Sequence, residues 1–314
     1  MKIIAIVDSG HGSYEYEKRV IAEHGYQLKI NENLQAPPEK RIEFAGDAVG
    51  ILVRGTVIDE SALQKMPLLK AIVRYGVGYD NVDVDAAKAR GIRVSNVQGY
   101  GNNSVSDHAM ALMYACTRNL IGNRKSTFGK PARMDVIELH DKSLGIIGIG
   151  RIGSHFSRKA SPLFRQTLAY DPYKTKDYMK NHGAEKADLA DLLKRSHVIS
   201  LHCNLTVETR HLLNDFCFNQ MENRPVIINT SRGPVIYEPD LLKALNNDLV
   251  HSAGLDVYEN EPPGRAQEKL LDHDRVVATP HIAWYSDKAA IELKQRAADN
   301  LIGLLTGKKI SDEL

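Results

Sequence analysis

The chain has 314 residues, of which 43% are hydrophobic and 25% charged, a composition typical of soluble globular proteins. Lysine and arginine total 41 against 39 for aspartate and glutamate, so the charge gives no support for a nucleic-acid or membrane partner. Three cysteines, without the spacing of metal ligands, predict a reducing cytoplasmic location and no metal site. The length is sufficient for two domains.

The N-terminal third alternates apolar strands with helices, which predicts a parallel sheet covered on both faces. The expected strands are 2–7, 26–30, 48–53 and 70–74. The expected helices are 14–24, 61–66 with Ser61 as its cap, and 84–89. In RYGVGYDNVD, Gly76 and Gly78 expose backbone N–H groups at the end of a strand. Such amides can bind a small anion such as a carboxylate, and an ordinary turn is the equally good alternative.

A long helix is predicted over 104–120, with Asn103 or Ser104 as its cap and apolar residues along one face. Asp107 and His108 lie near its start, where the helix dipole favours polar residues, and we interpret them in that way rather than as catalytic groups. The basic segment 121–142 that follows lacks a strong periodicity and is expected to cross the surface.

The segment 143–172, SLGIIGIGRIGSHFSRKASPLFRQTLAYDP, is predicted to bind a dinucleotide. An apolar strand over 144–149 turns through Gly148, Gly150 and Gly153, in the spacing G-x-G-x-x-G, and enters a segment with apolar residues at helical intervals. The first two glycines permit a tight turn and the approach of a pyrophosphate, and the third permits close packing of helix on strand. The phosphates then meet the positive end of the helix dipole.

The next strand, 167–170, is followed by Asp171, and this carboxylate predicts which dinucleotide binds. A carboxylate at this place can accept hydrogen bonds from the adenosine ribose hydroxyls and would repel a 2′-phosphate. We therefore expect NAD, while Lys174 and Lys176 leave NADP as the alternative.

The alternation continues beyond Pro172 and predicts a second doubly wound sheet. Its expected strands are 198–202, 226–229, 252–257 and 276–279, and its helices are 189–195, 214–219 and 238–246. A last helix, 286–305, could pack back on the first domain.

Three charged or titratable residues each follow a strand of this second sheet: Arg232 in NTSRGP, Glu261 in LDVYENEP and His281 in TPHIAW. Ligands of open α/β sheets bind beyond the carboxyl ends of the strands, so the three side chains can converge. A planar guanidinium can bind the carboxylate of a 2-oxo acid in bidentate fashion, and an imidazole can donate a proton to its carbonyl oxygen. A glutamate beside the imidazole would orient it and favour its charged form. Each residue alone also has a structural interpretation: Arg232 as part of a surface ion pair, Glu261 as a solvated acid and His281 as a hydrogen-bonded histidine after a proline.

The motifs RYGVGYDNVD, GIIGIGRIG, LHCNLT, INTSRGPVI, GLDVYENEP and TPHIAW, in this order, resemble the D-isomer-specific 2-hydroxyacid dehydrogenase family over almost the whole chain. The resemblance implies an NAD-binding Rossmann domain, 98–284, inserted into a flavodoxin-like catalytic domain made of 1–97 and 285–314. It also implies NAD-dependent interconversion of a 2-oxo acid and a D-2-hydroxy acid. Members are usually homodimers through the NAD domain, with 104–120 in the dimer region.

The resemblance also implies roles for individual residues. Arg232, Glu261 and His281 would form the catalytic set, and Asp256 would hold the nicotinamide carboxamide. The expected cofactor-binding set is Gly148, Gly150, Arg151, Ile152, Gly153, Asp171, Thr230 and Asp256. The expected substrate-binding set is Val77 and Gly78, in the family's carboxylate loop, Arg54, which matches a substrate-facing position of the phosphoglycerate members, and Trp284.

Two departures from the family pattern concern the substrate and the cofactor side. Asn204 replaces the usual proline of LHxPLT, and Ala283, Trp284 and Tyr285 follow His281. The string HIAWYS is similar to the co-repressor C-terminal binding proteins and, more loosely, to D-lactate dehydrogenases. An indole beside the catalytic imidazole would favour an apolar substrate side chain, and interdomain packing is the alternative role of Trp284. An NAD(H)-sensing, co-repressor-like interaction protein is the alternative function.

Overall fold

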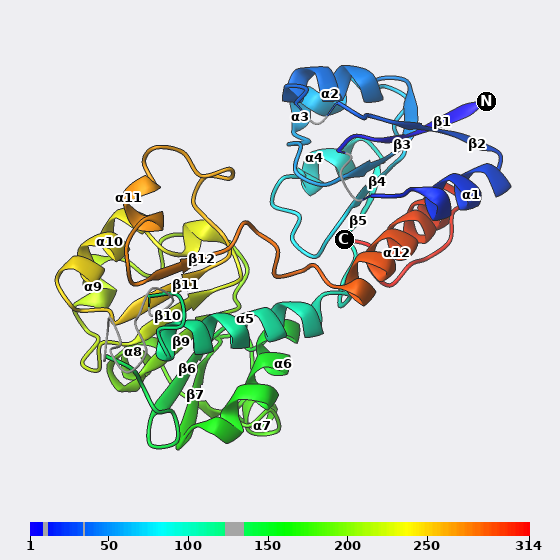
Figure 1. Cartoon of the computed structure of the whole chain (residues 1–314). Helices are drawn as coiled ribbons and strands as arrows, with labels where there is room; N and C mark the ends of the chain where they lie inside the picture. Colours follow the sequence, from blue (N-terminus) through cyan, green and yellow to red (C-terminus); the bar gives the residue numbers. More distant parts are fainter. Residues whose placement is uncertain (9–11, 34, 123–134) are drawn as a thin grey trace. The chain divides into compact units, whose positions relative to one another are not determined.

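The computed structural model describes residues 1–8, 12–33, 35–122 and 135–314, and the chain forms two compact units (Figure 1). The first unit contains Met1–Gly101 and Ser286–Leu314, and the second contains Asn102–Tyr285. The middle of the chain is therefore an insertion in the unit that contains both termini. Of the expected surface connection, 123–134 lie outside the described residues.

The sheet of the first unit has five parallel strands in the order β2-β1-β3-β4-β5. This order is that of the flavodoxin-like fold and confirms the predicted class. The strands are β1 Lys2–Ile6, β2 Tyr26–Ile30, β3 Ala48–Val53, β4 Ala71–Arg74 and β5 Arg93–Ser95. β5 was not expected from the sequence, because three residues are too few for a periodicity.

Helices cover both faces of this sheet. On one face, α12 (Asp287–Leu305) packs on α1 (Glu15–Glu23) and on the central strands, where Gly50 would bring a Cβ within 3.0 Å of Leu305. Residues of opposite parity on the same strands form the other core, with α2 (Pro38–Ala45), α3 (Glu60–Gln64) and α4 (Val84–Ala89). The predicted cap of α3 is wrong: the helix begins earlier, because the Asp59 side chain accepts a hydrogen bond from the Ala62 amide.

The sheet of the second unit has seven parallel strands in the order β12-β11-β10-β9-β6-β7-β8. This is the Rossmann order with one additional edge strand, and it also confirms the predicted class. The strand order reverses between β6 and β9, which marks the place where such sheets bind their ligands. The strands are β6 Ser143–Ile147, β7 Gln166–Tyr170, β8 Glu185–Lys186, β9 Val198–Leu201, β10 Val226–Asn229, β11 Ser252–Leu255 and β12 Val276–Ala278.

The long helix α5 (Asn102–Thr117) and α6 (Arg151–Ala160) share one face of this sheet (Figure 1). The opposite face carries α8 (Leu189–Arg195), α9 (Asp215–Phe218) and α10 (Glu238–Asn246). Shorter elements complete the unit: η2 (Ser161–Leu163), α7 (Lys176–Lys180), η3 (Gly233–Val235) and α11 (Glu268–Leu271). Among the described residues, no helix is both long and apolar enough to cross a membrane.

The limits predicted for α5 are wrong at both ends. The helix begins at Asn102, so Asn103 and Ser104 lie in its first turn and neither precedes it as a cap. It ends at Thr117 because Asn119 adopts a left-handed backbone conformation, with φ of 47°. Asparagine tolerates this conformation, which commonly terminates helices.

Candidate active site

The glycine loop after β6 is shaped by close backbone contacts. Gly148 has φ of +84°, and a Cβ on it would lie 2.6 Å from the amide nitrogen of Cys203. A Cβ on Gly153 would lie 2.1 Å from the carbonyl oxygen of Gly148. Nothing lies within 4 Å of the corresponding position at Gly150. Gly148 and Gly153 are therefore required by packing, whereas Gly150 leaves open space in front of its backbone.

This loop fits a dinucleotide. Gly150 precedes the ten-residue helix α6, which has no side-chain cap hydrogen bond and no acidic residue in its first turn. Its first amides and the positive end of its dipole can therefore bind a pyrophosphate in the open space. Two buried polar atoms that have no hydrogen-bond partner among the described residues follow the adjacent strands: Nδ1 of His202 after β9 and Oγ1 of Thr230 after β10. A bound polar group could satisfy such atoms.

Asp171, which follows β7, is buried and tied to the glycine loop. Its Oδ2 accepts the amide of Ile149 at 3.1 Å, and its Oδ1 accepts the amide of Tyr173 at 2.9 Å. A carboxylate has about four acceptor positions, so these bonds leave capacity for a ribose hydroxyl. Of the other expected contacts in this loop, Arg151 is exposed and Ile152 is half-buried.

His281 and Glu261 form the charged centre of the second unit. Nδ1 of His281 lies 2.6 Å from Oε2 of Glu261, while Oε1 of the glutamate accepts the amide of Tyr258 at 3.1 Å. Burial by itself would raise the pKa of Glu261, but the hydrogen bond and charge of His281, the Tyr258 amide and the Arg232 charge together hold it below its ordinary value. Glu261 is therefore ionised and fixes the orientation of the imidazole.

Arg232 follows β10, and its loop is organised by a single side chain. The Asn229 side chain accepts the amide of Ser231 at 3.0 Å and donates to the carbonyl of Arg232 at 3.0 Å. One guanidinium nitrogen, Nη1, donates to the carbonyl of Ser231 at 2.8 Å. The charge of Arg232 contributes to the low pKa of Glu261, so the structure brings together the three residues of the predicted catalytic set.

His281 itself has a left-handed backbone, with φ of 53°. This conformation is uncommon for a residue other than glycine, and it persists only where its surroundings hold it. Its amide donates to the carbonyl of Asp256 at 2.8 Å, and its carbonyl accepts the indole N–H of Trp284 at 3.1 Å. The indole ring also lies edge-on against Tyr285, with centroids 5.5 Å apart. Trp284 therefore supports the histidine loop.

Asp256 anchors the same loop through its carboxylate, which is almost completely buried. Oδ1 accepts the hydroxyl of Thr279 at 2.6 Å and the amide of Ile282 at 2.9 Å, and Oδ2 accepts the amide of Ala283 at 2.8 Å. His108 of α5 joins this network, with Nε2 2.9 Å from Oγ1 of Thr279. The roles of Thr279 and His108 cannot be predicted from the sequence, because no local pattern relates α5 to a loop so distant in the chain.

The remaining expected site residues belong to the first unit. Arg54 is exposed, and the amides of residues 54, 55 and 56 all donate to Oδ2 of Asp8 at 2.8–3.1 Å. These bonds and a hydrogen bond from the Thr56 hydroxyl lower the pKa of Asp8, although burial of the carboxylate acts in the opposite direction. The loop of Val77 and Gly78 is held through carbonyl oxygens, as in the 2.6 Å bond from Asn96 Nδ2 to the Val77 carbonyl.

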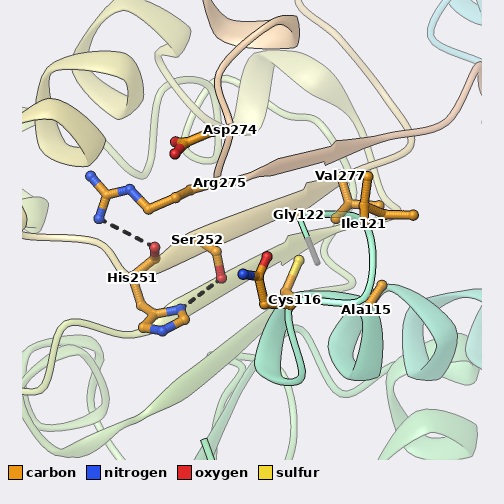
Figure 2. Close-up of a pocket in the computed structure, with 10 residues that line it drawn as sticks. Ala115, Cys116, Ile121, Gly122, His251, Ser252, Asp274, Arg275 and Val277 are labelled. Atoms are coloured by element: carbon orange, nitrogen blue, oxygen red, sulfur yellow. Dashed lines mark hydrogen bonds between the residues drawn. The ribbon is translucent and has the colours of Figure 1, made fainter. Parts of the chain in front are cut away.

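A small pocket also lies at the opposite end of the second sheet, between the start of β11 and the end of α5 (Figure 2). His251 bonds to Ser252 at 2.9 Å, and Arg275 bonds to the His251 carbonyl at 3.4 Å, so these three residues of its wall bind one another. Burial raises the pKa of Cys116 to about 12, which leaves this thiol protonated. The space admits little more than a water molecule, so we do not consider it an active site.

Comparisons with known proteins agree on one family. The family model of the D-isomer specific 2-hydroxyacid dehydrogenase NAD-binding domain matches residues 110–283. The chain is 34% identical over 307 residues to a glyoxylate reductase of Korarchaeum cryptofilum, covering 92% of each protein. It is 33% identical over 311 residues to a D-3-phosphoglycerate dehydrogenase of Archaeoglobus fulgidus, covering 98% of this chain and 58% of that one.

A solved structure extends this likeness to a complex with cofactor. The fold matches that of D-lactate dehydrogenase from Aquifex aeolicus complexed with NAD and lactic acid, with a TM-score of 0.86 and 28% identity over 98% of this chain and 96% of that one. These matches confirm the resemblance and the cofactor expected from the sequence. The chain is a member of the D-isomer specific 2-hydroxyacid dehydrogenase family and, with it, an NAD-dependent oxidoreductase.

Proposed function

We propose that the protein interconverts a 2-oxo acid and a D-2-hydroxy acid, with Arg232, Glu261 and His281 as its catalytic residues. The observation that carries this proposal is the 2.6 Å hydrogen bond between His281 Nδ1 and the ionised Glu261, beside the guanidinium of Arg232. Such a pair can hold a proton at a defined place, and the adjacent cation can hold a carboxylate.

When bound, NADH would provide the hydride for C2 of the substrate, and NAD would accept it in the oxidising direction. Arg232 binds the substrate carboxylate, because its planar fork matches the two oxygens. Since Nδ1 of His281 is bonded to Glu261, its Nε2 remains to donate a proton to the carbonyl oxygen. The carboxylate of Glu261 stabilises the charged imidazolium before this transfer. In the oxidising direction, the neutral imidazole accepts the hydroxyl proton.

The cofactor would be held by the loop and strand ends described above. We propose that the amides at the start of α6 bind the pyrophosphate, with Gly148, Gly150, Arg151, Ile152 and Gly153 forming the loop. Asp171 would accept the ribose hydroxyls and so favour NAD over NADP. Thr230 would contribute its buried hydroxyl. Asp256 would bind the nicotinamide carboxamide through the acceptor position that its three hydrogen bonds within the protein leave unused.

Four further residues are assigned to the substrate. We propose that Val77, Gly78 and Arg54 contact the substrate and that Trp284 favours an apolar side chain on it. The support for Trp284 is its bond to the His281 carbonyl, which fixes an indole next to the proton donor. We also propose that the enzyme is a cytoplasmic homodimer through its NAD-binding domain.

The test is NADH oxidation, followed by absorbance, across glyoxylate, pyruvate, hydroxypyruvate, phosphohydroxypyruvate, 2-oxoisocaproate and 4-methylthio-2-oxobutyrate. We expect turnover of at least one acid, its loss in His281→Ala and its retention in His140→Ala. His140 is a matched control, because it too lies beside a glutamate, Glu138, but is 75% exposed. Tight NADH binding without turnover of any acid would overturn the proposal and favour the NAD(H)-sensing interaction protein.

A further inference from the structure

The loops that carry Arg232 and Glu261 are in direct backbone contact. A Cβ on Gly233 would lie 1.8 Å from the carbonyl carbon of Tyr258 and 2.4 Å from the amide nitrogen of Glu259. No side chain can separate the two loops at this point. Their mutual position must therefore be set by groups around the contact.

His211 is the residue that joins both loops from a third one, between β9 and α9. Its amide donates to the carbonyl of Pro234 at 2.7 Å, two residues after Arg232 in the chain. Its Nε2 lies 2.7 Å from Oε1 of Glu259, two residues before Glu261. The imidazole also packs on the Tyr237 ring, with centroids 4.8 Å apart.

The backbone of His211 shows that these contacts constrain it. Its φ is 53°, a left-handed conformation that it shares with the proposed proton donor, His281. A non-glycine residue keeps such a conformation only where its surroundings over-determine it. The Asn214 side chain adds a further bond, from Nδ2 to the His211 carbonyl at 3.0 Å.

Glu259 is held from both sides. Its carboxylate is 20% exposed and accepts His211, with Arg210 3.7 Å away, while its amide donates to Oε1 of the buried Glu238 at 2.7 Å. The next turn of chain contains Glu261, whose Oε1 accepts the Tyr258 amide at 3.1 Å. The His211–Glu259 pair thus fixes the start of segment 258–261. The end of the segment carries Glu261, which pairs with His281.

We propose that His211 is a positioning residue of the reaction: through Glu259 it fixes the segment that presents Glu261 to His281. This role rests on the proposed function, because the orientation of the His281–Glu261 pair affects activity only if that pair is catalytic. Neither His211 nor Glu259 contacts the substrate in this scheme, and no proton passes through them.

The experiment compares His211→Asn, Glu259→Ala, Glu259→Gln and the double variant His211→Asn/Glu259→Ala with His140→Asn as control. Asparagine tolerates the left-handed backbone, so His211→Asn removes the imidazole while sparing the turn. Glu259→Gln keeps an acceptor oxygen for His211, so it should retain the activity that Glu259→Ala loses. We measure kcat and its pH dependence with the best 2-oxo acid, the Kd of NADH by fluorescence, and the downfield Nδ1 proton signal of His281 by NMR.

We expect kcat to fall about tenfold in His211→Asn and Glu259→Ala, since small misplacements of reacting groups are costly. The double variant should be no worse than either single one, because both remove the same contact. The pH profile of kcat should also change, because Glu261 is no longer held in place against the imidazole of His281. The Kd of NADH should stay within about twofold of the wild-type value, because the glycine loop is untouched.

A loss of thermal stability with kcat and its pH profile unchanged would overturn the inference and leave His211 a structural residue. Additive losses in the double variant would also overturn it. If the wild type turns over no 2-oxo acid, the proposed function fails. The positioning role is then tested by the NMR signal of the His281 Nδ1 proton alone. If His211 fixes Glu261, this signal weakens in His211→Asn and persists in Glu259→Gln.

Discussion

Asp256→Asn tests how the histidine loop is held, because it changes one carboxylate oxygen into an amide nitrogen. In the wild type, Oδ1 accepts two donors, from Thr279 and Ile282, and Oδ2 accepts the amide of Ala283. An asparagine can keep its oxygen in only one of these places. With the oxygen toward Thr279 and Ile282, the new NH2 group faces the Ala283 amide, so two buried donors oppose each other.

The expected cost is about 2–4 kcal/mol, the loss of one bond to a charged acceptor together with an unsatisfied buried amide. For a protein of 314 residues, such a loss lowers the midpoint of thermal unfolding by roughly 3–6 °C. Release of the His281 backbone should also lower kcat at least about tenfold. Calorimetry and NADH oxidation measure both effects. The control is Asp272→Asn, at an exposed position, which should change neither. An Asp256→Asn variant with wild-type midpoint and kcat would refute the assignment of Asp256 as the anchor.

Three further outcomes are expected. Glu261→Gln should lower kcat about 10²-fold in the NADH assay. Because the folded pKa of Glu261 is depressed, its ionisation stabilises the wild type at neutral pH, and this contribution is lost as the pH falls through the folded pKa. Calorimetry should therefore show a steeper loss of stability below about pH 5 for the wild type than for Glu261→Gln, and parallel curves would contradict this. Gly150→Ala should weaken NADH binding and leave the unfolding midpoint unchanged, since its Cβ meets open space within the protein. Gly153→Ala should lower both the affinity for NADH and the unfolding midpoint, since its Cβ would lie 2.1 Å from the Gly148 carbonyl oxygen. Fluorescence titration measures the affinity, and calorimetry measures the midpoint. Glu17→Gln should become more stable relative to wild type as the pH rises above about 4.5, because burial raises the pKa of Glu17 and ionising it costs the folded state stability; a constant difference in midpoint would refute this.

Much of the fold could be predicted from the sequence because the buried strands are apolar on both faces. β3 (AVGILV) and β9 (VISL) are fully buried and mostly apolar, so both strands can be predicted from the sequence, although β9 ends at Leu201 and not at His202. β8 has two residues and α11 has four, and both were missed because such lengths contain no periodicity. The cap of α3 was misplaced because Asp59 and Ser61 are both good caps, and only the structure shows which side chain bonds to the helix amides.

The site was predictable to the extent that parallel strands place their following residues at one edge. This rule alone predicts that Arg232, Glu261 and His281 lie close together. It could not predict that His108, on a helix far away in the chain, bonds to the threonine beside His281. Such bonds depend on how elements pack, and a histidine in a first helical turn gives no local sign of them. Asp256 could likewise be placed near the site, but its three internal bonds could be found only from the structure.

The return of the chain to the first unit has a consequence for the order in which the protein is made. On the ribosome, the second unit is complete once Tyr285 has emerged, but the five-stranded sheet still lacks α12, which buries Ala297, Leu301 and Leu304. We expect the inserted unit to fold first, since domains fold as units during synthesis. Until α12 arrives, one apolar face of β3 and β4 is uncovered, which makes the nascent first unit a natural client for chaperones.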